Sequence, residues 1–494
     1  MPLPLLIEIV PLTSPVRAEI TVPGSKSITN RALILAALAD GRTTLRGALW
    51  SEDTQVMTDC LRVLGFTVDV QVDPAEFCNR TITVDGLGGR LPRAGTAAQP
   101  LELFVGNAGT AARFLAAMVC LGDGVYRLSG VPRMHERPQA ALFAALRELG
   151  YRVESERADD KLPARIFGEI QNPKSEIRNC RVSVMESSQF ASALLLAGGV
   201  GGWQVEITGA NEDELPYVDM TRELVKVFPA KGGEFQIEPD ASSGSYFWAA
   251  GVVSALIPGV GDRPTGNLAV AKGVTETVLV RDWPDSGWQI DAEFPSDLPL
   301  LVGYHSMDLE QMAAAEIEVA GRYGAGWRER VELELREWRD NYHAEHGIKG
   351  LSRNDDLGDS IMTAIVVSAL GSQRFQFTDL GRLRVQECER VVALRTELTK
   401  CGAKVIEEGD TLTVYPSALR GAEIETYDDH RMAMCFAVLG LKVPGIKIKN
   451  PACVKKTFPN FFQKLATPPP HGLGAEIRDA ATGRNLPVEE LFAD

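Results

Sequence analysis

The 494-residue sequence has few of the features that mark secreted, membrane or metal-dependent proteins. Its eight cysteines are scattered and form no CxxC pair, which predicts reduced thiols in a cytoplasmic protein. The opening MPLPLLIEIVPL has no basic stretch or small-residue cleavage site, and the longest apolar run, residues 246–258, is too short to span a bilayer. His343 and His346 form an HxxH without a nearby cysteine or an HExxH pattern, so we expect solvated helix residues and no metal site.

Common catalytic signatures are missing as well. The sequence has no nucleophile elbow, no P-loop lysine motif and no GxGxxG after a strand. Its formal net charge of −15 argues against nonspecific nucleic-acid binding. An acidic protein that binds an acidic metabolite must gather its basic residues locally. Lysines and arginines in polar, glycine-rich stretches are therefore informative.

One unit recurs along the chain, in which helical and strand periods alternate. It starts with small polar residues and continues with an apolar helix, a strand, a second helix and another strand. We call the small polar residues and the apolar helix that follows them the opener of a unit. The six openers are PGSKSITNRALILAALADG, GNAGTAARFLAAMVCLG, SSQFASALLLAGG, ASSGSYFWAAGVVSAL, GDSIMTAIVVSALG and YDDHRMAMCFAVLGL. Six such units cannot easily share one sheet, and the length exceeds the usual limit of a single core. The sequence therefore predicts an α/β protein with two domains of three units each.

Two units are irregular. The third looks truncated, because residues 217–240 leave room for a helix end and little else. The fourth is stretched between Ser245 and Asp359 and contains a charged amphipathic segment, residues 326–347, that predicts an added helix. After about residue 465 the chain becomes polar and proline-rich, which predicts a surface extension.

The openers are suited to holding anions. Helix N-termini present unpaired N–H groups and a partial positive charge. Small polar residues stand at these starts: Ser25, Ser27, Asn107, Thr110, Ser187 and Ser188. Simple helix capping explains any one opener, but six openers beside basic residues favour a site for a multiply charged anion. The basic residues are Lys26, Arg31, Arg133, Arg137, Arg384, Arg390, Arg431, Lys455 and Lys456, whereas Arg113 fits a structural role better.

Acidic residues among these cations are acid–base candidates. They are Asp359 at the fifth helix start, Glu387 in RVQECER, and Asp428 and Asp429 before His430. A carboxylate near several cations stays ionised and suits a general base. For Asp359, capping and catalysis are equally compatible with its position.

At these motifs the chain resembles the 5-enolpyruvylshikimate-3-phosphate synthase family. The stretches that carry the resemblance are PGSKSITNRALILAALADG, LFVGNAGTAARFLAA, GVPRMHERP, SSQFASALLL, EPDASSGSYF, GDSIMTA, YDDHRMAMCF and KKTFPNFF. The resemblance implies the enolpyruvyl transferase fold, an inverse α/β barrel-like arrangement with three βαβαββ units in each domain. One domain would span residues 20–238 and the other residues 1–19 and 239–466, with an insertion at about 262–350 and a C-terminal extension at 467–494.

The resemblance also implies a reaction without metal or organic cofactor, and we expect a monomeric enzyme of the cytoplasm. The 5-hydroxyl of shikimate 3-phosphate adds to C2 of phosphoenolpyruvate while C3 takes a proton, and the tetrahedral intermediate then loses a proton and phosphate. Lys26, Asp359 and Glu387 would be catalytic, with Asp359 as the base for the hydroxyl and Glu387 as the acid at the methyl carbon. Shikimate 3-phosphate would contact Lys26, Ser27, Arg31, Ser187, Ser188, Gln189, Tyr217, Asp359, Arg382 and Gln386. Phosphoenolpyruvate would contact Lys26, Asn107, Gly109, Arg137, Gln189, Arg390, Arg431 and Lys456.

The sequence departs from the family pattern at three places. Gln386 replaces a lysine in RVQE, and Arg382, at a usual asparagine position, could restore the charge. Glu214 stands at a serine position before ProTyr, where a carboxylate would repel a phosphate. Ala112 and Phe114 replace methionine and proline, which predicts altered sensitivity to glyphosate, the family's inhibitor at the phosphoenolpyruvate site.

Two alternatives remain open. UDP-N-acetylglucosamine enolpyruvyl transferase shares the fold and chemistry, but no cysteine here lies in a suitable motif beside Arg137. A non-catalytic descendant that binds phosphorylated metabolites is the other, and the departures at Gln386 and Glu214 are its support.

Overall fold

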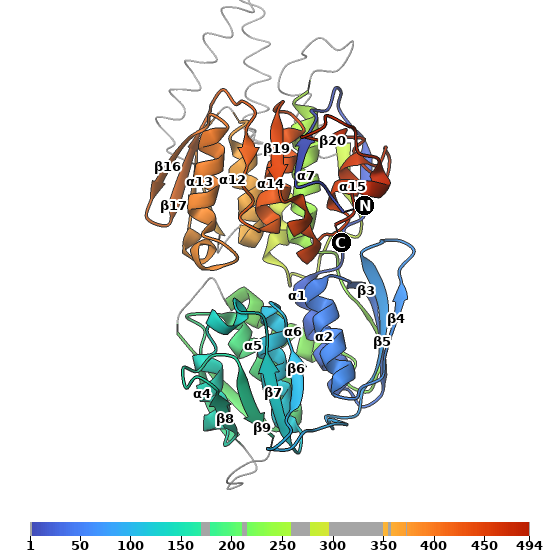
Figure 1. Ribbon diagram of the computed structural model, residues 1–494, viewed down its shortest axis with the longest axis vertical. Helices are drawn as coiled ribbons and strands as arrows, with labels where there is room; N and C mark the ends of the chain where they lie inside the picture. Colours follow the sequence, from blue (N-terminus) through green and yellow to red (C-terminus); the bar gives the residue numbers. More distant parts are fainter. Residues whose placement is uncertain are drawn as a thin grey trace, which may run out of the picture.

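The computed structural model describes residues 2–168, 178–209, 215–257, 277–295, 349–353, 357–371 and 373–493. Two hydrophobic cores divide these residues between an upper and a lower domain (Figure 1). The lower core takes its side chains from residues 28–237, and the upper core takes them from residues 3–22 and 246–493. The prediction of two α/β domains is confirmed.

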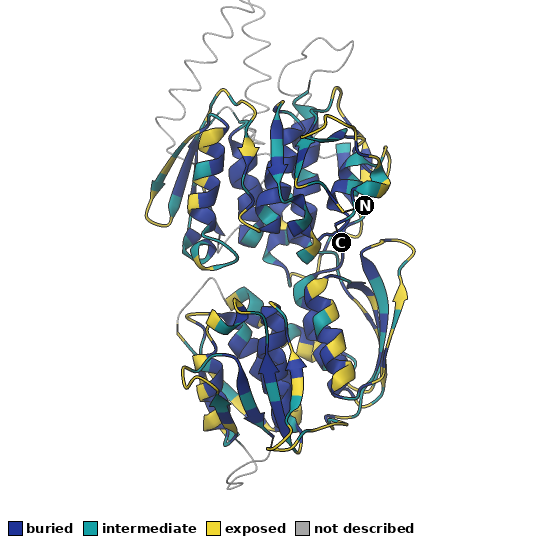
Figure 2. Ribbon diagram, viewed as in Figure 1, coloured by how far each residue is buried: buried dark blue, intermediate teal, exposed yellow. Residues whose placement is uncertain are grey.

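The lower domain has three helices at its centre, α1 (Lys26–Leu38), α3 (Gly109–Met118) and α5 (Ser188–Gly201). Ten of the thirteen residues of α1 are buried, and every residue of α3 is buried, as expected for helices enclosed on all sides (Figure 2). The outer helices are α2 (Glu52–Val63), α4 (Ala140–Glu148) and α6 (Leu215–Val227). The α5 helix ends at Gly202, whose φ of +64° is a left-handed conformation that glycine adopts readily.

Sheets surround these helices. One sheet has the order β12-β3-β5-β4, a second has β6-β7-β9-β8, and β10 pairs with β11. The strands are β3 (Arg42–Leu49), β4 (Val68–Val72), β5 (Asn79–Asp85), β6 (Leu101–Phe104), β7 (Val125–Ser129), β8 (Arg152–Ser155), β9 (Ala164–Phe167), β10 (Arg178–Ser183), β11 (Trp203–Thr208) and β12 (Gly233–Gln236). The third unit therefore has a whole second helix and a strand after it, and β12 pairs in parallel with β3 of the first unit.

The upper domain repeats this plan. Its central helices are α7 (Ala241–Ala255), α12 (Ile361–Ser368) and α14 (His430–Gly440), with α13 (Arg390–Lys400) outside and α15 (Phe461–Ala466) near the domain junction. The sheets are β14-β15-β17-β16, β18-β19-β1-β20 and the pair β13-β2. Their strands are β1 (Leu6–Ile9), β2 (Ala18–Ile20), β13 (Val278–Val280), β14 (Lys349–Ser352), β15 (Phe375–Thr378), β16 (Lys404–Glu408), β17 (Thr411–Tyr415), β18 (Glu423–Ile424), β19 (Ile446–Lys449) and β20 (Ile477–Asp479).

The strand pairs show the repeat more clearly than the sequence does. Among the described strands, a parallel pair flanks four of the six central helices, as β6 and β7 flank α3, and two antiparallel strands extend four of the six parallel pairs. Where the chain crosses between the domains, the pairs are exchanged. The strand β2 precedes α1 but pairs with β13 in the upper domain, whereas β12 precedes α7 but pairs with β3 in the lower one. The two crossings meet where the amide of Ser25 donates to the carbonyl oxygen of Glu238 at 2.8 Å.

The expected surface extension at the C-terminus is wrong. Leu473, Ile477 and Leu491 are buried in the upper core, and β20 pairs antiparallel with β1. Apolar residues at intervals in this polar segment turn inward and complete the sheet, which composition alone did not indicate. The predicted helix at 326–347, the HxxH and Glu214 lie outside the described residues. None of the described helices is both long and apolar enough to cross a bilayer.

Candidate active site

A cleft of about 730 Å³ lies between the two domains, and all six central helices begin at it. Residues from the first turn of each helix or just before it line the cleft: Lys26, Gly109, Ser188, Ser242, Asp359 and Arg431. Asp240 caps α7 and Asp429 caps α14, with 2.7 Å to the amide of Ser243 and 2.9 Å to that of Arg431. The N-cap residues of α1 and α3, Ser25 and Ala108, make no side-chain capping hydrogen bond, so the first amides of these two helices remain directed at the cleft.

Two of the charged candidates do not line the cleft, because Arg384 pairs with Glu389, Glu407 and Asp410 and Asp429 caps α14. The residues that the family resemblance assigns to catalysis or to substrate binding all line this one cleft. These are Lys26, Ser27, Arg31, Asn107, Gly109, Arg137, Ser187, Ser188, Gln189, Tyr217, Asp359, Arg382, Gln386, Glu387, Arg390, Arg431 and Lys456. They come from both domains and from segments up to 430 positions apart (456 − 26) in the chain. The structure thus brings the residues together, while their individual roles stay predictions.

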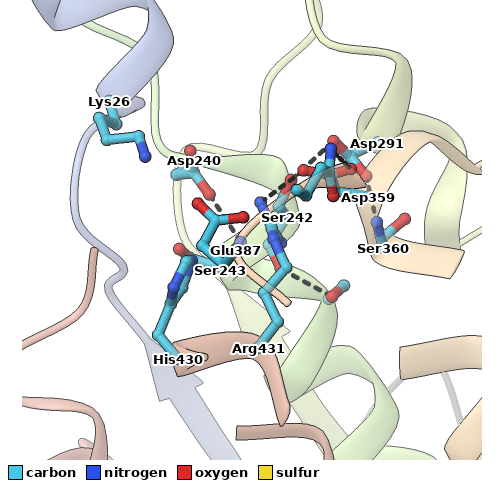
Figure 3. A network of polar contacts seen from close by, with 12 residues as sticks. Lys26, Asp240, Ser242, Ser243, Asp291, Asp359, Ser360, Glu387, His430 and Arg431 are labelled. Carbon is cyan, nitrogen blue, oxygen red and sulfur yellow. Dashed lines mark hydrogen bonds and ion pairs between the residues drawn. The ribbon is translucent and has the colours of Figure 1, made fainter. Parts of the chain in front are cut away.

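Asp359 is surrounded by arginines. It lies in the short 3₁₀ helix η5 (Gly358–Ser360) before α12, and its Oδ2 is 3.1 Å from Nη2 of Arg431 (Figure 3). Its Oδ1 is 2.9 Å from Nη2 of Arg353. Burial alone would raise the pKa of Asp359, but Arg431, Arg353 and Arg390 outweigh it and hold this pKa well below its ordinary value. Asp359 is therefore an ionised cleft carboxylate. The capping bond to the Ser360 amide comes instead from Asp291, at 2.5 Å.

Glu387 lies between two cations. Its Oε1 is 2.8 Å from Nζ of Lys456, and its Oε2 is 2.8 Å from Nη2 of Arg390. Burial would raise the pKa of Glu387, but the charges of Lys456 and Arg390 keep it well below its usual value. His430 lies beside it in Figure 3, and burial lowers the pKa of this imidazole so that it is neutral at pH 7.

Two arginines of the predicted set are also structural. Arg31 is 2% exposed, and its Nε donates to Thr221 Oγ1 at 2.7 Å and its Nη2 to Ser192 Oγ at 3.1 Å. It therefore ties α1 to α5 and α6 behind the cleft wall. Arg390 is 1% exposed and donates from Nε to Asp429 Oδ2 at 2.7 Å, so it orients the residue that caps α14.

Close packing explains Gly109 and the neighbouring arginines. A Cβ at Gly109 would lie 2.6 Å from Nη1 of Arg113 and 2.7 Å from Nη2 of Arg137. Arg113 donates to the carbonyl oxygens of Gly109 and Pro138, at 3.2 and 2.9 Å, as its structural interpretation predicted. Arg137 donates to the carbonyl oxygen of Asn107 at 3.1 Å and faces the cleft.

Several residues of the cleft were not predicted from the sequence. Asp53, in the first turn of α2, lies 3.3 Å from Nζ of Lys26. Asp291 and Gln289 come from the stretched fourth unit, and Arg353 follows β14. Asp53 lies at the start of a helix that is not one of the six central helices. No spacing signal marks Gln289, Asp291 or Arg353, because they do not lie in a periodic helix or strand; WQID was visible in the sequence but had no repeat to align with. Within the described part of the chain, no group of three or more His, Cys, Asp or Glu side chains is arranged to hold a metal ion.

Comparisons with known proteins agree with the resemblance. The profile of the EPSP synthase (3-phosphoshikimate 1-carboxyvinyltransferase) family matches residues 10–231 and 329–465. A 3-phosphoshikimate 1-carboxyvinyltransferase of Opitutus terrae is 35% identical, covering 94% of this chain and 98% of that protein. One from Nostoc is also 35% identical, covering 93% and 98%. Among solved structures, an EPSP synthase of Acinetobacter baumannii has a TM-score of 0.62 at 19% identity, covering 96% of this chain and 99% of that one. The enolpyruvyl transferase NikO of Streptomyces tendae has a TM-score of 0.57 at 14% identity, covering 99% and 100%; both likenesses concern the fold.

Proposed function

This chain belongs to the EPSP synthase family and is a 3-phosphoshikimate 1-carboxyvinyltransferase, and from that premise we propose how its cleft residues divide the reaction. The enzyme transfers the enolpyruvyl group of phosphoenolpyruvate to the 5-hydroxyl of shikimate 3-phosphate and releases phosphate, a step of aromatic amino-acid biosynthesis. The comparisons do not favour UDP-N-acetylglucosamine enolpyruvyl transferase or a non-catalytic binding protein.

We propose that Asp359 accepts the proton of the 5-hydroxyl as the oxygen attacks C2 of phosphoenolpyruvate. The observation that carries this assignment is the pair of contacts that Asp359 makes with Arg353, at 2.9 Å, and with Arg431, at 3.1 Å, just before α12 begins; these two cations favour the ionised carboxylate. A carboxylate that stays ionised is available as a base across the whole physiological pH range. Glu387 then protonates C3, and it removes a proton from that carbon when phosphate leaves. Its position beside Lys456 and Lys26 places it where anionic substrates alter its charge balance.

Each substrate is assigned its own set of cleft residues, and each set contains residues from both domains. Ser187, Ser188 and Gln189 at the start of α5, with Ser27, Arg31 and Tyr217, are assigned to shikimate 3-phosphate, as are Arg382 and Gln386 from the upper domain. Asn107, Gly109 and Arg137 with Arg390, Arg431 and Lys456 are assigned to phosphoenolpyruvate, and Lys26 and Gln189 to both. Backbone amides and guanidinium groups match phosphate and carboxylate oxygens in geometry and charge.

The proposal includes a monomeric enzyme of the cytoplasm without metal or organic cofactor. The residues assigned above to catalysis and substrate binding all come from one chain. A single peak of about 54 kDa in light scattering would support the monomer, since the chain mass is 53.6 kDa.

Phosphate release from phosphoenolpyruvate tests the assignment. We expect release that depends on shikimate 3-phosphate in the wild type and falls by about a thousandfold in Asp359→Ala. Asp85→Ala, which removes an acid outside the cleft that pairs with Arg42, is the matched control and retains activity. Tight binding of shikimate 3-phosphate without release by the wild type would instead support a binding protein. Equal rates for Asp359→Ala and the wild type would exclude Asp359 as the base.

A further inference from the structure

A guanidinium that no sequence motif marks reaches the carboxylate assigned as the base. Arg353 directly follows β14, and only 3% of its side chain is exposed. It lines the cleft, and its Nη2 donates to Oδ1 of Asp359 at 2.9 Å. Burying a guanidinium costs solvation, and a carboxylate at hydrogen-bonding distance offsets that cost. Arg353 therefore has a defined position relative to one oxygen of Asp359.

Gln386 approaches the same oxygen. Its Nε2 lies 3.4 Å from Oδ1 of Asp359, while its Oε1 accepts a hydrogen bond from Nη1 of Arg390. Since Arg390 can only donate, it fixes the orientation of this amide and turns the NH₂ group toward Asp359. The amide contributes a hydrogen bond without a charge. At Oδ1 the positive charge is supplied by Arg353.

The other oxygen has its own cations. Oδ2 lies 3.1 Å from Nη2 of Arg431 and 4.0 Å from Nη1 of Arg390. Two further titratable groups interact with Asp359, namely the buried carboxyl of Asp291 and the hydroxyl of Tyr217. The like charge of Asp291 disfavours an ionised Asp359, so the cation at Oδ1 is needed in addition to those at Oδ2.

We propose that Arg353 is a positioning residue of the transferase site, which orients Asp359 from its Oδ1 side and supplies there the charge that Gln386 lacks. The inference rests on the proposed role of Asp359 as the base. It places the compensating charge on Arg353 and not on Arg382, whose Nη1 donates at 2.9 Å to the carbonyl oxygen of Glu186 in the lower domain. Position 386 and position 353 are then interchangeable sources of one charge.

A charge-exchange series tests this inference. We expect Arg353→Met to lower kcat by about thirtyfold, because the base loses its orientation. The KM for phosphoenolpyruvate should change little, because the residues assigned to phosphoenolpyruvate stay the same. Gln386→Lys alone adds a cation beside Arg390 and removes the acceptor of its Nη1, so it also lowers kcat. The double variant Arg353→Met/Gln386→Lys returns charge to Oδ1 and recovers at least about fivefold of the loss in Arg353→Met. A purely structural arginine would show no such recovery.

The matched comparison is Arg382→Asn/Gln386→Lys, which removes the other candidate cation. We expect no recovery there relative to Gln386→Lys. Recovery in this pair and none in the Arg353 pair would overturn the inference in favour of Arg382. Should Arg353→Met fail to fold, Gln386→Lys still decides, since activity equal to the wild type would contradict a site that already has its charge. The rate of phosphate release by the wild type, compared with that by Asp359→Ala, tests the proposed function independently of these kcat recoveries.

Discussion

Lys456 and Glu387 form an ion pair of 2.8 Å inside the cleft, in which the proposed proton donor is held as a carboxylate by a proposed substrate ligand. Glu387 cannot donate a proton while Lys456 holds it as a carboxylate, and Lys456 cannot bind a substrate anion while it is paired with Glu387. An anionic substrate that draws Lys456 and Arg390 to itself removes the two charges that lower the pKa of Glu387. Its pKa then rises, and the side chain takes up a proton. The ion pair thus couples substrate binding to the acid needed at C3.

We therefore predict that phosphoenolpyruvate and shikimate 3-phosphate bind with net proton uptake at pH 7. Calorimetric titrations in buffers of different ionisation enthalpy measure this uptake directly. Glu387→Gln should abolish it and lower kcat by about a thousandfold. Glu389→Gln is the control, because Glu389 pairs with Arg384 and does not line the cleft. Uptake that persists unchanged in Glu387→Gln would show that another group takes the proton.

The altered α3 sequence predicts an inhibition difference. Phe114 is fully buried in the middle of α3, with the Arg31 guanidinium carbon 5.3 Å from its ring centre. A proline at this position removes a helix hydrogen bond and clashes with the preceding turn, where Gly109 and Thr110 lie. We expect Ala112→Met/Phe114→Pro to change the glyphosate inhibition constant by about threefold or more, whereas Ala112→Met alone does not. Equal constants for all three proteins would mean that the first turn of α3 does not respond to position 114.

Asp291 predicts a pH dependence of stability. Its Oδ2 accepts from Ser242 Oγ at 2.6 Å, and its Oδ1 accepts from the Ser360 amide. Burial, with the charge of Asp359, raises the pKa of Asp291 from 3.8 to about 6. A carboxyl whose pKa is raised on folding contributes stability below about pH 4, and this contribution is lost as the pH rises through about 6. The difference corresponds to about 3 kcal/mol of unfolding free energy.

Asp291→Asn removes this titration and keeps an acceptor for the Ser360 amide. Its melting temperature relative to the wild type should therefore rise between pH 4 and pH 7 and stay constant above that. Thermal unfolding at a series of pH values measures the difference. Asp59→Asn, at a side chain that is 70% exposed, is the control and should show no such trend. A constant difference for Asp291→Asn would show that Asp291 does not titrate in this range.

How far the sequence predicts this site depends on where each residue lies. The six openers were visible because an apolar helix follows small polar residues in each of them, and the structure turns every one of these helix starts to the cleft. Arg353 and Asp291 were not visible, since a charged residue in a loop has no periodicity that fixes its direction. The buried C-terminal strand was missed for a related reason, because β20 is only three residues long and its partner β1 lies at the opposite end of the chain.

The domain junction offers a last prediction. Glu76, in the loop between β4 and β5, is 3% exposed and lies 2.7 Å from Nζ of Lys464 in α15. It also accepts from Thr21 Oγ1 at 2.6 Å and from Asn460 Nδ2 at 2.7 Å, so a lower-domain carboxylate is held by two upper-domain side chains and one crossing residue. Lys464→Met leaves this buried carboxylate without its cation, which should lower the unfolding free energy by about 3 kcal/mol. Urea denaturation measures the loss.

The partner variant separates the charge from the packing. Glu76→Gln/Lys464→Met removes both charges and should recover most of the loss, because no unpaired carboxylate remains buried. Lys449→Met, which breaks the exposed pairs with Glu423 and Glu425, is the surface control and should cost no more than about 0.5 kcal/mol. Equal losses for Lys464→Met and Lys449→Met would mean that Glu76 reaches solvent when Lys464 is absent, and the junction would then open more easily than the burial of Glu76 indicates.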